Sequence, residues 1–239
     1  IEYVLEALDE AFQSIAEPSI FNSGELSDSW MNPKIMIQIV DKFETQHRHR
    51  LLTLTKSGSK NPMVSLLLEK SRKQTITAFS INAPKVAERY ERAAPPPEER
   101  IEAARLLSQA GYDTRLRIDP IFPIQNWKND YGDLLYSILS ALEPNRIILG
   151  TPRGLWKTIV FAKKARMDMS WTNYFSEEQT GWGKKLPFEI RKEIYQFMYD
   201  RLSGMGFSRD RVSMCKEEVS MWKEMKLNYT PLTCNCYGN

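Results

Sequence analysis

Strand-like and helix-like segments alternate along most of this chain, and the alternation limits the folds open to it. Short apolar or β-branched runs occupy residues 20–22, 51–55, 75–79, 114–118, 146–149 and 211–214. Helical patterns are expected near residues 4–12, 33–43, 62–71, from 84, 98–107, 130–142, 187–202 and 216–225. Strands separated by helices predict right-handed crossovers and a parallel sheet.

Five or six such units favour an α/β fold of the partial (βα)6, TIM-like barrel type. A doubly wound open sheet is the competing architecture, and no glycine-rich dinucleotide fingerprint supports it. With 239 residues, of which 42% are hydrophobic, the chain suits one sizeable core. We therefore expect residues 1–239 to form a single partial barrel domain with a C-terminal extension.

Charge and cysteine content narrow the class of protein. The formal net charge of +3 permits an anionic ligand without requiring nucleic acid. No apolar run approaches a membrane span, and no signal peptide opens the chain. Three cysteines argue against a secreted disulfide scaffold, so a cytoplasmic location is predicted. Because the chain opens on Ile1 and at once shows a helical pattern, we expect it to begin inside a longer native sequence.

Polar residues follow each predicted strand. In a parallel α/β barrel the strand ends converge on one mouth, where ligand groups lie. The mouth is expected to hold Glu25, Ser27, Asp28, Lys56, Ser80, Asn82, Arg117, Asp119 and Arg153. Both signs of charge and several hydroxyls suit a small zwitterionic ligand, such as an amino-acid moiety with a sugar attached.

Local structural roles compete with ligand binding for these residues. Ser, Asp and Asn after a strand are also favoured as turn formers and helix caps. Arg115 and Arg117 point the same way along one strand, and a structural ion pair with Asp119 is as well supported as a ligand contact. Lys56, beside a Ser-Gly turn, is a ligand candidate or a solvated lysine.

Histidine and cysteine positions do not support a nucleophilic triad or a zinc site. His47 and His49 lie in a basic polar stretch, which favours surface positions. Cys234 and Cys236 form a close pair in a Gly-ended tail, and a flexible thiol pair is favoured over a disulfide or metal site. Cys215 is either a buried small hydrophobe or a thiol at the mouth.

A basic stretch at residues 163–166 precedes an aromatic segment from Trp171 to Trp182. Cations mixed with aromatic rings can hold phosphates and stack bases. A charge run is more often a solvated face, and that interpretation is favoured here.

Several motifs together resemble spore photoproduct lyase and its wider set of relatives. They are the Phe-Ser-Ile-Asn run at 79–82, Glu-Glu-Arg-Ile-Glu-Ala-Ala at 98–104, Ala-Gly-Tyr at 110–112 and Arg-Ile-Asp-Pro-Ile at 117–121, with Trp127 and Tyr131. The Ser-Gly-Glu-Leu-Ser-Asp-Ser run at 23–29 and Cys-Lys-Glu at 215–217 with Trp222 look more like the relatives than the lyase itself.

This resemblance implies a partial radical S-adenosylmethionine (AdoMet) barrel whose 5′-deoxyadenosyl radical abstracts hydrogen from a substrate, with nucleic acid as one candidate. Family members hold a [4Fe–4S] cluster on a cysteine triplet after the first strand. No such triplet exists here, so the first strand and the cluster ligands are expected outside this chain. An open barrel edge could then mediate oligomerisation.

The same resemblance assigns the AdoMet contacts. Gly24 and Glu25 match positions near its amino group, with Ser27 beside them. Lys56 matches the position for its carboxylate, and Ser80 and Asn82 lie nearer the ribose. Arg117 and Asp119 complete the expected cofactor-binding set, and no residue is assigned to metal binding or catalysis.

One position departs from the lyase. The lyase carries its hydrogen-donating cysteine just before the Ser-Asp pair, and aligning Ser27 and Asp28 puts Glu25 there. A carboxylate cannot donate a hydrogen atom to a carbon radical, so cleavage of AdoMet without photoproduct repair is expected. The alternative function is a cluster-free barrel that binds nucleic acid or a protein partner.

Overall fold

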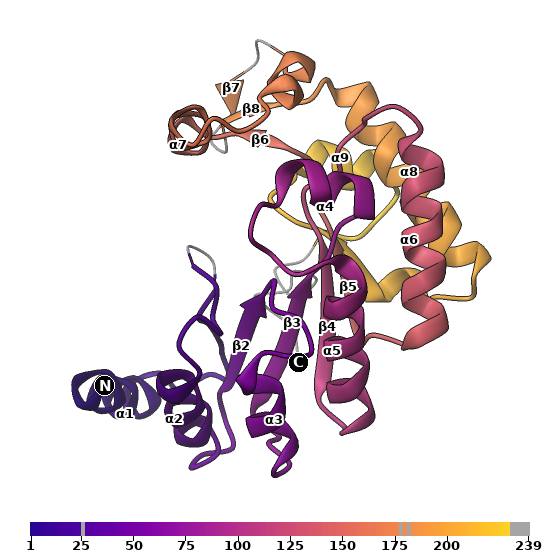
Figure 1. The fold of residues 1–239 in the computed structure, drawn as a ribbon. Coiled ribbons are helices and arrows are strands. Elements are labelled where there is room, and N and C mark those ends of the chain that lie inside the picture. Colours follow the sequence, from indigo (N-terminus) through magenta and orange to yellow (C-terminus); the bar gives the residue numbers. More distant parts are fainter. Residues whose placement is uncertain (25–26, 177–178, 181–182, 230–239) are drawn as a thin grey trace.

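Six parallel strands form a central sheet that curls into a half-barrel (Figure 1). The computed structural model describes residues 1–24, 27–176, 179–180 and 183–229. The strands are β1 (Ile20–Asn22), β2 (Arg50–Thr55), β3 (Thr75–Ser80), β4 (Asp113–Ile118), β5 (Arg146–Leu149) and β9 (Val212–Met214). They pair in the order β1-β2-β3-β4-β5-β9, and each neighbouring pair is parallel. The predicted partial barrel is thus confirmed, and the open doubly wound sheet is not observed.

Helices lie along the outer face of this sheet and beyond the ends of its strands (Figure 1). They are α1 (Glu2–Ser14), α2 (Pro33–Phe43), α3 (Pro62–Leu68), α4 (Pro84–Tyr90), α5 (Pro97–Gln109), α6 (Trp127–Ala141), α8 (Phe188–Gly204) and α9 (Val219–Glu224). Strand residues such as Phe79, Leu116 and Leu149 belong to the large core that includes helix side chains. Side chains alternate along a strand, so Leu52, Ile76 and Ala78 form a smaller cluster on the opposite face.

Local sequence signals start these helices where the structure has them. Asn32 and Asn61 each accept a hydrogen bond from a backbone N–H in the first turn of α2 and α3. A proline follows each of them, and the fixed φ angle of proline suits the first helical position. Helix α5 begins at Pro97 after the Ala-Pro run and stops before Gly111, whose φ of 86° is the left-handed conformation that ends helices.

A smaller layer is inserted between β5 and β9. It contains β6 (Arg153–Gly154), α7 (Trp156–Lys164), a 3-10 turn (Ser170–Tyr174), β7 (Gln179–Thr180) and β8 (Gly183–Lys185). Its strands form an antiparallel sheet in the order β6-β8-β7. The layer lies beyond the ends toward which the β2 and β3 arrows point in Figure 1. Sequence patterns did not predict these elements, and strands of two or three residues in particular show no alternation.

Two predicted helices are shorter than expected. α3 ends at Leu68 rather than residue 71, and the Arg72 side chain binds the carbonyls of Leu66 and Lys70 at 2.8 and 3.2 Å. α9 starts at Val219 rather than residue 216, because Lys216 adopts a φ of 53°, which a right-handed helix excludes.

One histidine position was predicted wrongly. His47 is exposed, as expected, but His49 is 1% exposed and its ring stacks on Phe12 at a centroid distance of 5.6 Å. Phe21 also contacts the ring, so α1 and β1 bury it. A basic neighbourhood in the sequence does not reveal that an aromatic helix face will cover one of its members.

None of the helices in the described part of the chain has the length and hydropathy of a membrane span.

Candidate functional site

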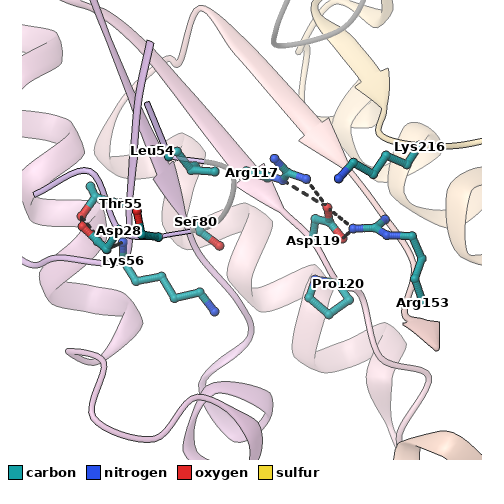
Figure 2. A pocket seen from close by; sticks show the side chains of 12 residues that line it. Asp28, Leu54, Thr55, Lys56, Ser80, Arg117, Asp119, Pro120, Arg153 and Lys216 are labelled. Atoms are coloured by element: carbon teal, nitrogen blue, oxygen red, sulfur yellow. Dashed lines mark hydrogen bonds and ion pairs between the residues drawn. The ribbon is translucent and has the colours of Figure 1, made fainter. Parts of the chain in front are cut away.

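A cavity of about 360 Å³ opens at the carboxyl ends of the parallel strands. Figure 2 shows side chains from β2 to β4 and from the segments after β1, β5 and β9 converging on it. Its lining contains Gly24, Ser27, Asp28, Leu54, Thr55, Lys56, Ser80, Arg117, Asp119, Pro120, Arg153 and Lys216. The structure thus brings most of the predicted mouth residues together. Glu25 lies outside the described residues, and Asn82 is not part of the lining.

The segment after β1 is held against the end of β2 by Asp28. Its carboxylate accepts hydrogen bonds from the Thr55 hydroxyl at 2.8 Å, from the Lys56 backbone N–H at 2.7 Å and from the Trp30 N–H at 2.8 Å. These bonds make Asp28 a structural clamp, one of the two roles that the sequence left open.

Gly24 lies where the backbone of this segment comes closest to β2. A Cβ added at Gly24 would be 2.6 Å from Ser29 Oγ and 2.7 Å from the Cβ of Leu54. Ser29 also accepts a hydrogen bond from the Leu54 N–H and donates its own N–H to the Leu54 carbonyl. Only glycine allows this approach, which keeps Gly24 against β2 at the cavity wall.

Lys56 follows β2 and extends its side chain along the cavity (Figure 2). Its Nζ lies 2.6 Å from Glu91 Oε1, and the other carboxylate oxygen of Glu91 accepts from Arg100 Nη1 at 2.6 Å. Burial on its own raises the pKa of the Glu91 carboxyl, but the charges of Lys56 and Arg100 outweigh burial and hold that pKa below its usual value. Glu91 is therefore an ionised, buried carboxylate shared by two cations.

The residues after β3 divide between the cavity and the core. Ser80 ends β3 and lines the cavity. Asn82, by contrast, is 1% exposed, donates its amide N–H to the Pro120 carbonyl at 2.8 Å and accepts from the Tyr131 hydroxyl at 2.7 Å. The expected ribose contact of Asn82 stays a prediction, and these bonds give the side chain a structural role.

On the other side of the cavity, Asp119 binds two guanidinium groups. Arg117 Nη2 lies 2.7 Å and Arg153 Nη2 lies 3.0 Å from Asp119 Oδ2. Burial alone raises the pKa of this carboxyl, but Arg153 and Arg117 together hold the pKa below its usual value. Gly150 makes room for the carboxylate, because a Cβ there would be 2.4 Å from Asp119 Cγ.

Arg115 lies away from the mouth, whereas Cys215 lies next to it. Arg115 forms a salt bridge with Asp113 at 2.9 Å at the opposite end of β4, so it is not a mouth residue. Cys215 is 5% exposed, and its Sγ lies 3.1 Å from Arg117 Nη2. The thiol is therefore both buried and adjacent to the mouth, where the sequence had left these as alternatives.

The sequence analysis missed a buried ionic cluster beside the mouth. Glu217 follows Lys216, and its carboxylate binds Arg191 and accepts from Lys185 Nζ at 3.2 Å and from the Tyr195 hydroxyl at 3.0 Å. These partners come from β8 and α8, so the cluster joins the inserted layer to the segment after β9. Charged residues inside helices and short strands carry no pattern that marks them as buried. Glu91, at the end of α4, and Arg100, within α5, likewise carry no sequence pattern that marks them as buried.

The described residues contain no group of three or more His, Cys, Asp or Glu side chains arranged to hold a metal ion. Cys234 and Cys236 lie outside the described residues. The side chains in this part of the chain thus fit a charged organic ligand better than an iron–sulfur cluster.

Comparisons with known proteins agree with this architecture. A family model described as spore photoproduct lyase matches residues 32–148. A spore photoproduct lyase from Clostridium acetobutylicum is 39% identical over 70 residues, which make up 29% of this chain and 21% of that protein.

Solved structures extend the likeness of the fold. A spore photoproduct lyase with bound AdoMet and dinucleoside spore photoproduct superposes with a TM-score of 0.72 at 18% identity, covering 88% of this chain and 65% of that one. SuiB of Streptococcus suis bound to S-adenosylmethionine gives a TM-score of 0.51 at 10% identity, covering 88% and 42% of the two chains. The chain thus spans less than two thirds of the length of these relatives. In its fold, and in sequence over residues 32–148, the chain resembles spore photoproduct lyase.

Proposed function

We propose that this chain forms the AdoMet-binding barrel of a radical AdoMet enzyme related to spore photoproduct lyase. One observation carries the proposal: residues at the ends of three adjacent parallel strands, or just after them, line one cavity, namely Gly24, Ser27, Asp28, Lys56 and Ser80. The likeness to a lyase with bound AdoMet supports the same assignment. Such a constellation at the carboxyl ends of strands is the usual ligand position in α/β barrels.

The chemistry of these side chains fits AdoMet, which carries a carboxylate, an ammonium and a ribose. The Lys56 ammonium is a charge-assisted donor for the carboxylate. Ser80 offers a hydroxyl toward the ribose, and Gly24, Glu25 and Ser27 are the proposed neighbours of the amino group. Arg117 and Asp119 form the far wall and fix the shape of the cavity.

When bound, AdoMet supplies the 5′-deoxyadenosyl group with which this enzyme class abstracts hydrogen. The chain's own contribution is to orient AdoMet and to shield it from water. The described residues do not supply a [4Fe–4S] site.

AdoMet affinity tests this proposal. The protein would be prepared anaerobically at full length with its cluster reconstituted, and AdoMet binding would be measured by calorimetry. A charge-assisted contact is worth about 1.5–3 kcal/mol, so Lys56→Ala should weaken binding roughly tenfold or more. Lys60→Ala is the matched control, because Lys60 pairs with Glu99 and its side chain is 86% exposed. Unchanged affinity in Lys56→Ala would remove Lys56 from the site, and a wild-type protein that binds no AdoMet would contradict the proposed function.

A nucleic-acid substrate is the second part of the proposal. Residues 155–167 carry Lys157, Lys163, Lys164 and Arg166 and no acidic residue. Trp156 is 73% exposed and Phe161 is 63% exposed on the same helix, α7. Exposed rings beside cations suit stacked bases and phosphates. The likeness to a lyase complexed with dinucleoside spore photoproduct supports this class of substrate.

Binding of a labelled single-stranded oligothymidylate, followed by fluorescence anisotropy, tests this part. The double variant Lys163→Ala/Lys164→Ala should weaken binding and reduce its salt dependence, because fewer counterions are released. Full affinity in that variant would place the nucleic acid elsewhere. Oligonucleotide binding by a protein that binds no AdoMet would favour the cluster-free binding module instead.

A further inference from the structure

Lys56 enters the cavity already bound to a buried carboxylate. Its side chain is 39% exposed, whereas the side chain of its partner Glu91 is 5% exposed. Glu91 caps the C-terminal end of α4, outside the cavity lining. The reach of the Lys56 ammonium into the cavity therefore depends on a residue that does not itself line it.

Arg100 fixes Glu91 from behind. Its side chain is fully buried and donates to Glu91 Oε2 at 2.6 Å, to the Ser80 carbonyl at 3.0 Å and to the Pro95 carbonyl at 2.8 Å. One guanidinium thus connects the end of β3, the end of α4 and the segment before α5. Arg100 binds the Ser80 carbonyl directly and holds Lys56 through Glu91, so the positions of both cavity residues depend on the same buried side chain.

The charges of this group match a ligand carboxylate. Lys56 and Arg100 contribute two positive charges, and Glu91 contributes one negative charge. An ammonium has three donors, so Lys56 can keep its bond to Glu91 and still donate to a second carboxylate. Arriving there, that carboxylate would make the group neutral, which is a favourable arrangement for partly buried charges.

We infer that Glu91 is a positioning residue that holds the Lys56 ammonium over the carboxylate end of the bound ligand. This inference rests on the proposed function, because it concerns the same cavity. Glu91 touches neither the cavity nor the ligand, and it acts through Lys56.

The substitution Glu91→Gln should remove the bond of Glu91 to Lys56 and keep its bond to Arg100. A glutamine side chain has one carbonyl oxygen, and its amide NH2 group cannot accept from a cation. The fully buried Arg100 needs the acceptor most, so the substitution should release Lys56 and leave Arg100 held. This variant therefore tests the bond to Lys56 and still leaves Arg100 a hydrogen-bond acceptor, which Glu91→Ala would remove.

A double-mutant cycle compares the effect of Glu91→Gln on AdoMet affinity in the presence of Lys56 and in the Lys56→Ala background. With Lys56 present, Glu91→Gln should lower AdoMet affinity about threefold or more, because the ammonium loses its fixed position. In the Lys56→Ala background the same change should raise affinity, because it removes a carboxylate that repels the carboxylate of the ligand. A change of the same sign in both backgrounds, or none in either, would overturn the inference.

Two controls separate positioning from a general structural role. 5′-Methylthioadenosine lacks the amino-acid end of AdoMet, so its affinity should stay constant across all four proteins, and a parallel loss would overturn the inference. Glu88→Gln alters an exposed carboxylate on the same helix and should leave AdoMet affinity unchanged. If the wild-type protein binds AdoMet but the cycle shows no change of sign, only the inference fails. If the wild-type protein does not bind AdoMet, the proposed function fails first.

Discussion

The charged side chains on the two sides of the cavity differ in how far they are exposed to solvent. After β2, Lys56 keeps 39% of its side chain exposed and shares a carboxylate that lies behind the cavity wall. After β4, Asp119 is 2% exposed and is enclosed by Arg117 and Arg153, which are 12% and 15% exposed (Figure 2). A buried ion pair whose charges bind only each other has a structural role, whereas a cation with an exposed end remains available to a ligand. This contrast supports our proposal that the β2 side is the binding side, and that the β4 side is the scaffold that shapes it.

Removing the enclosed carboxylate should give the largest effect. Asp119→Asn leaves two partly buried guanidinium groups without their anion, and breaking a buried pair in this way costs about 3–5 kcal/mol. Urea unfolding monitored by circular dichroism would measure the loss. Asp133→Asn on the exposed face of α6 is the control and should stay within about 0.5 kcal/mol of the wild type. A similarly small change for Asp119→Asn would contradict the scaffold role.

Filling the space beside that carboxylate should have the next largest effect. Gly150→Ala places a Cβ 2.4 Å from Asp119 Cγ, so the ion pair must shift, at a cost of about 1–3 kcal/mol. Gly204→Ala at the end of α8 is the matched control, since its Cβ would meet nothing within 4 Å. Equal stability of both variants in thermal unfolding would mean that the Asp119 ion pair can shift at little cost.

Acid should weaken the scaffold side by a smaller amount. The folded-state pKa of Asp119 is lowered, so its contribution to stability is complete above the unfolded pKa of about 3.9 and is lost as pH falls through the folded pKa. We expect unfolding free energy to fall below about pH 4, and to fall less steeply in Asp119→Asn. Parallel slopes for the two proteins would show that other carboxylates dominate.

The smallest change in stability is expected on the binding side. Lys56→Ala removes a partly exposed cation, while Glu91 keeps its bond to Arg100, so the loss should be at most about 1 kcal/mol. Unfolding measured beside AdoMet binding sharpens the comparison, because the same variant should lose roughly tenfold in affinity. A stability loss as large as that of Asp119→Asn would make Lys56 a scaffold residue too.

The sequence predicted the sheet well because its strands are buried and regular. The bounds of β1 and β5 match the expected residues, and β2, β3, β4 and β9 differ by one residue at an end. The rule that polar residues after parallel strands converge placed Lys56, Ser80, Arg117 and Asp119 around one cavity. That rule depends only on the direction of the strands, so a single sequence is enough to apply it.

The same rule could not say which polar residues face a ligand. Asp28 and Asn82 follow strands as Lys56 does, yet both are used by hydrogen bonds within the protein. Glu91 follows α4 and Arg100 lies on α5, and only tertiary packing brings the two side chains behind Lys56. His49 likewise became buried through the docking of α1. Such roles follow from tertiary contacts, which no local pattern encodes.

The pairing of β5 with β9 makes the inserted layer an excursion from one strand to its neighbour. The two strands are parallel, so the chain leaves the sheet at the carboxyl end of β5 and returns at the amino end of β9, where Val212 pairs with Ile147. Closing a longer flexible loop costs little more than closing a shorter one, about 0.6 kcal/mol for each doubling of length. Changes of length in the flexible connections of this layer should therefore cost little and leave the pairing of β5 with β9 unchanged. The layer above the mouth can therefore vary without rebuilding the parallel sheet beneath it.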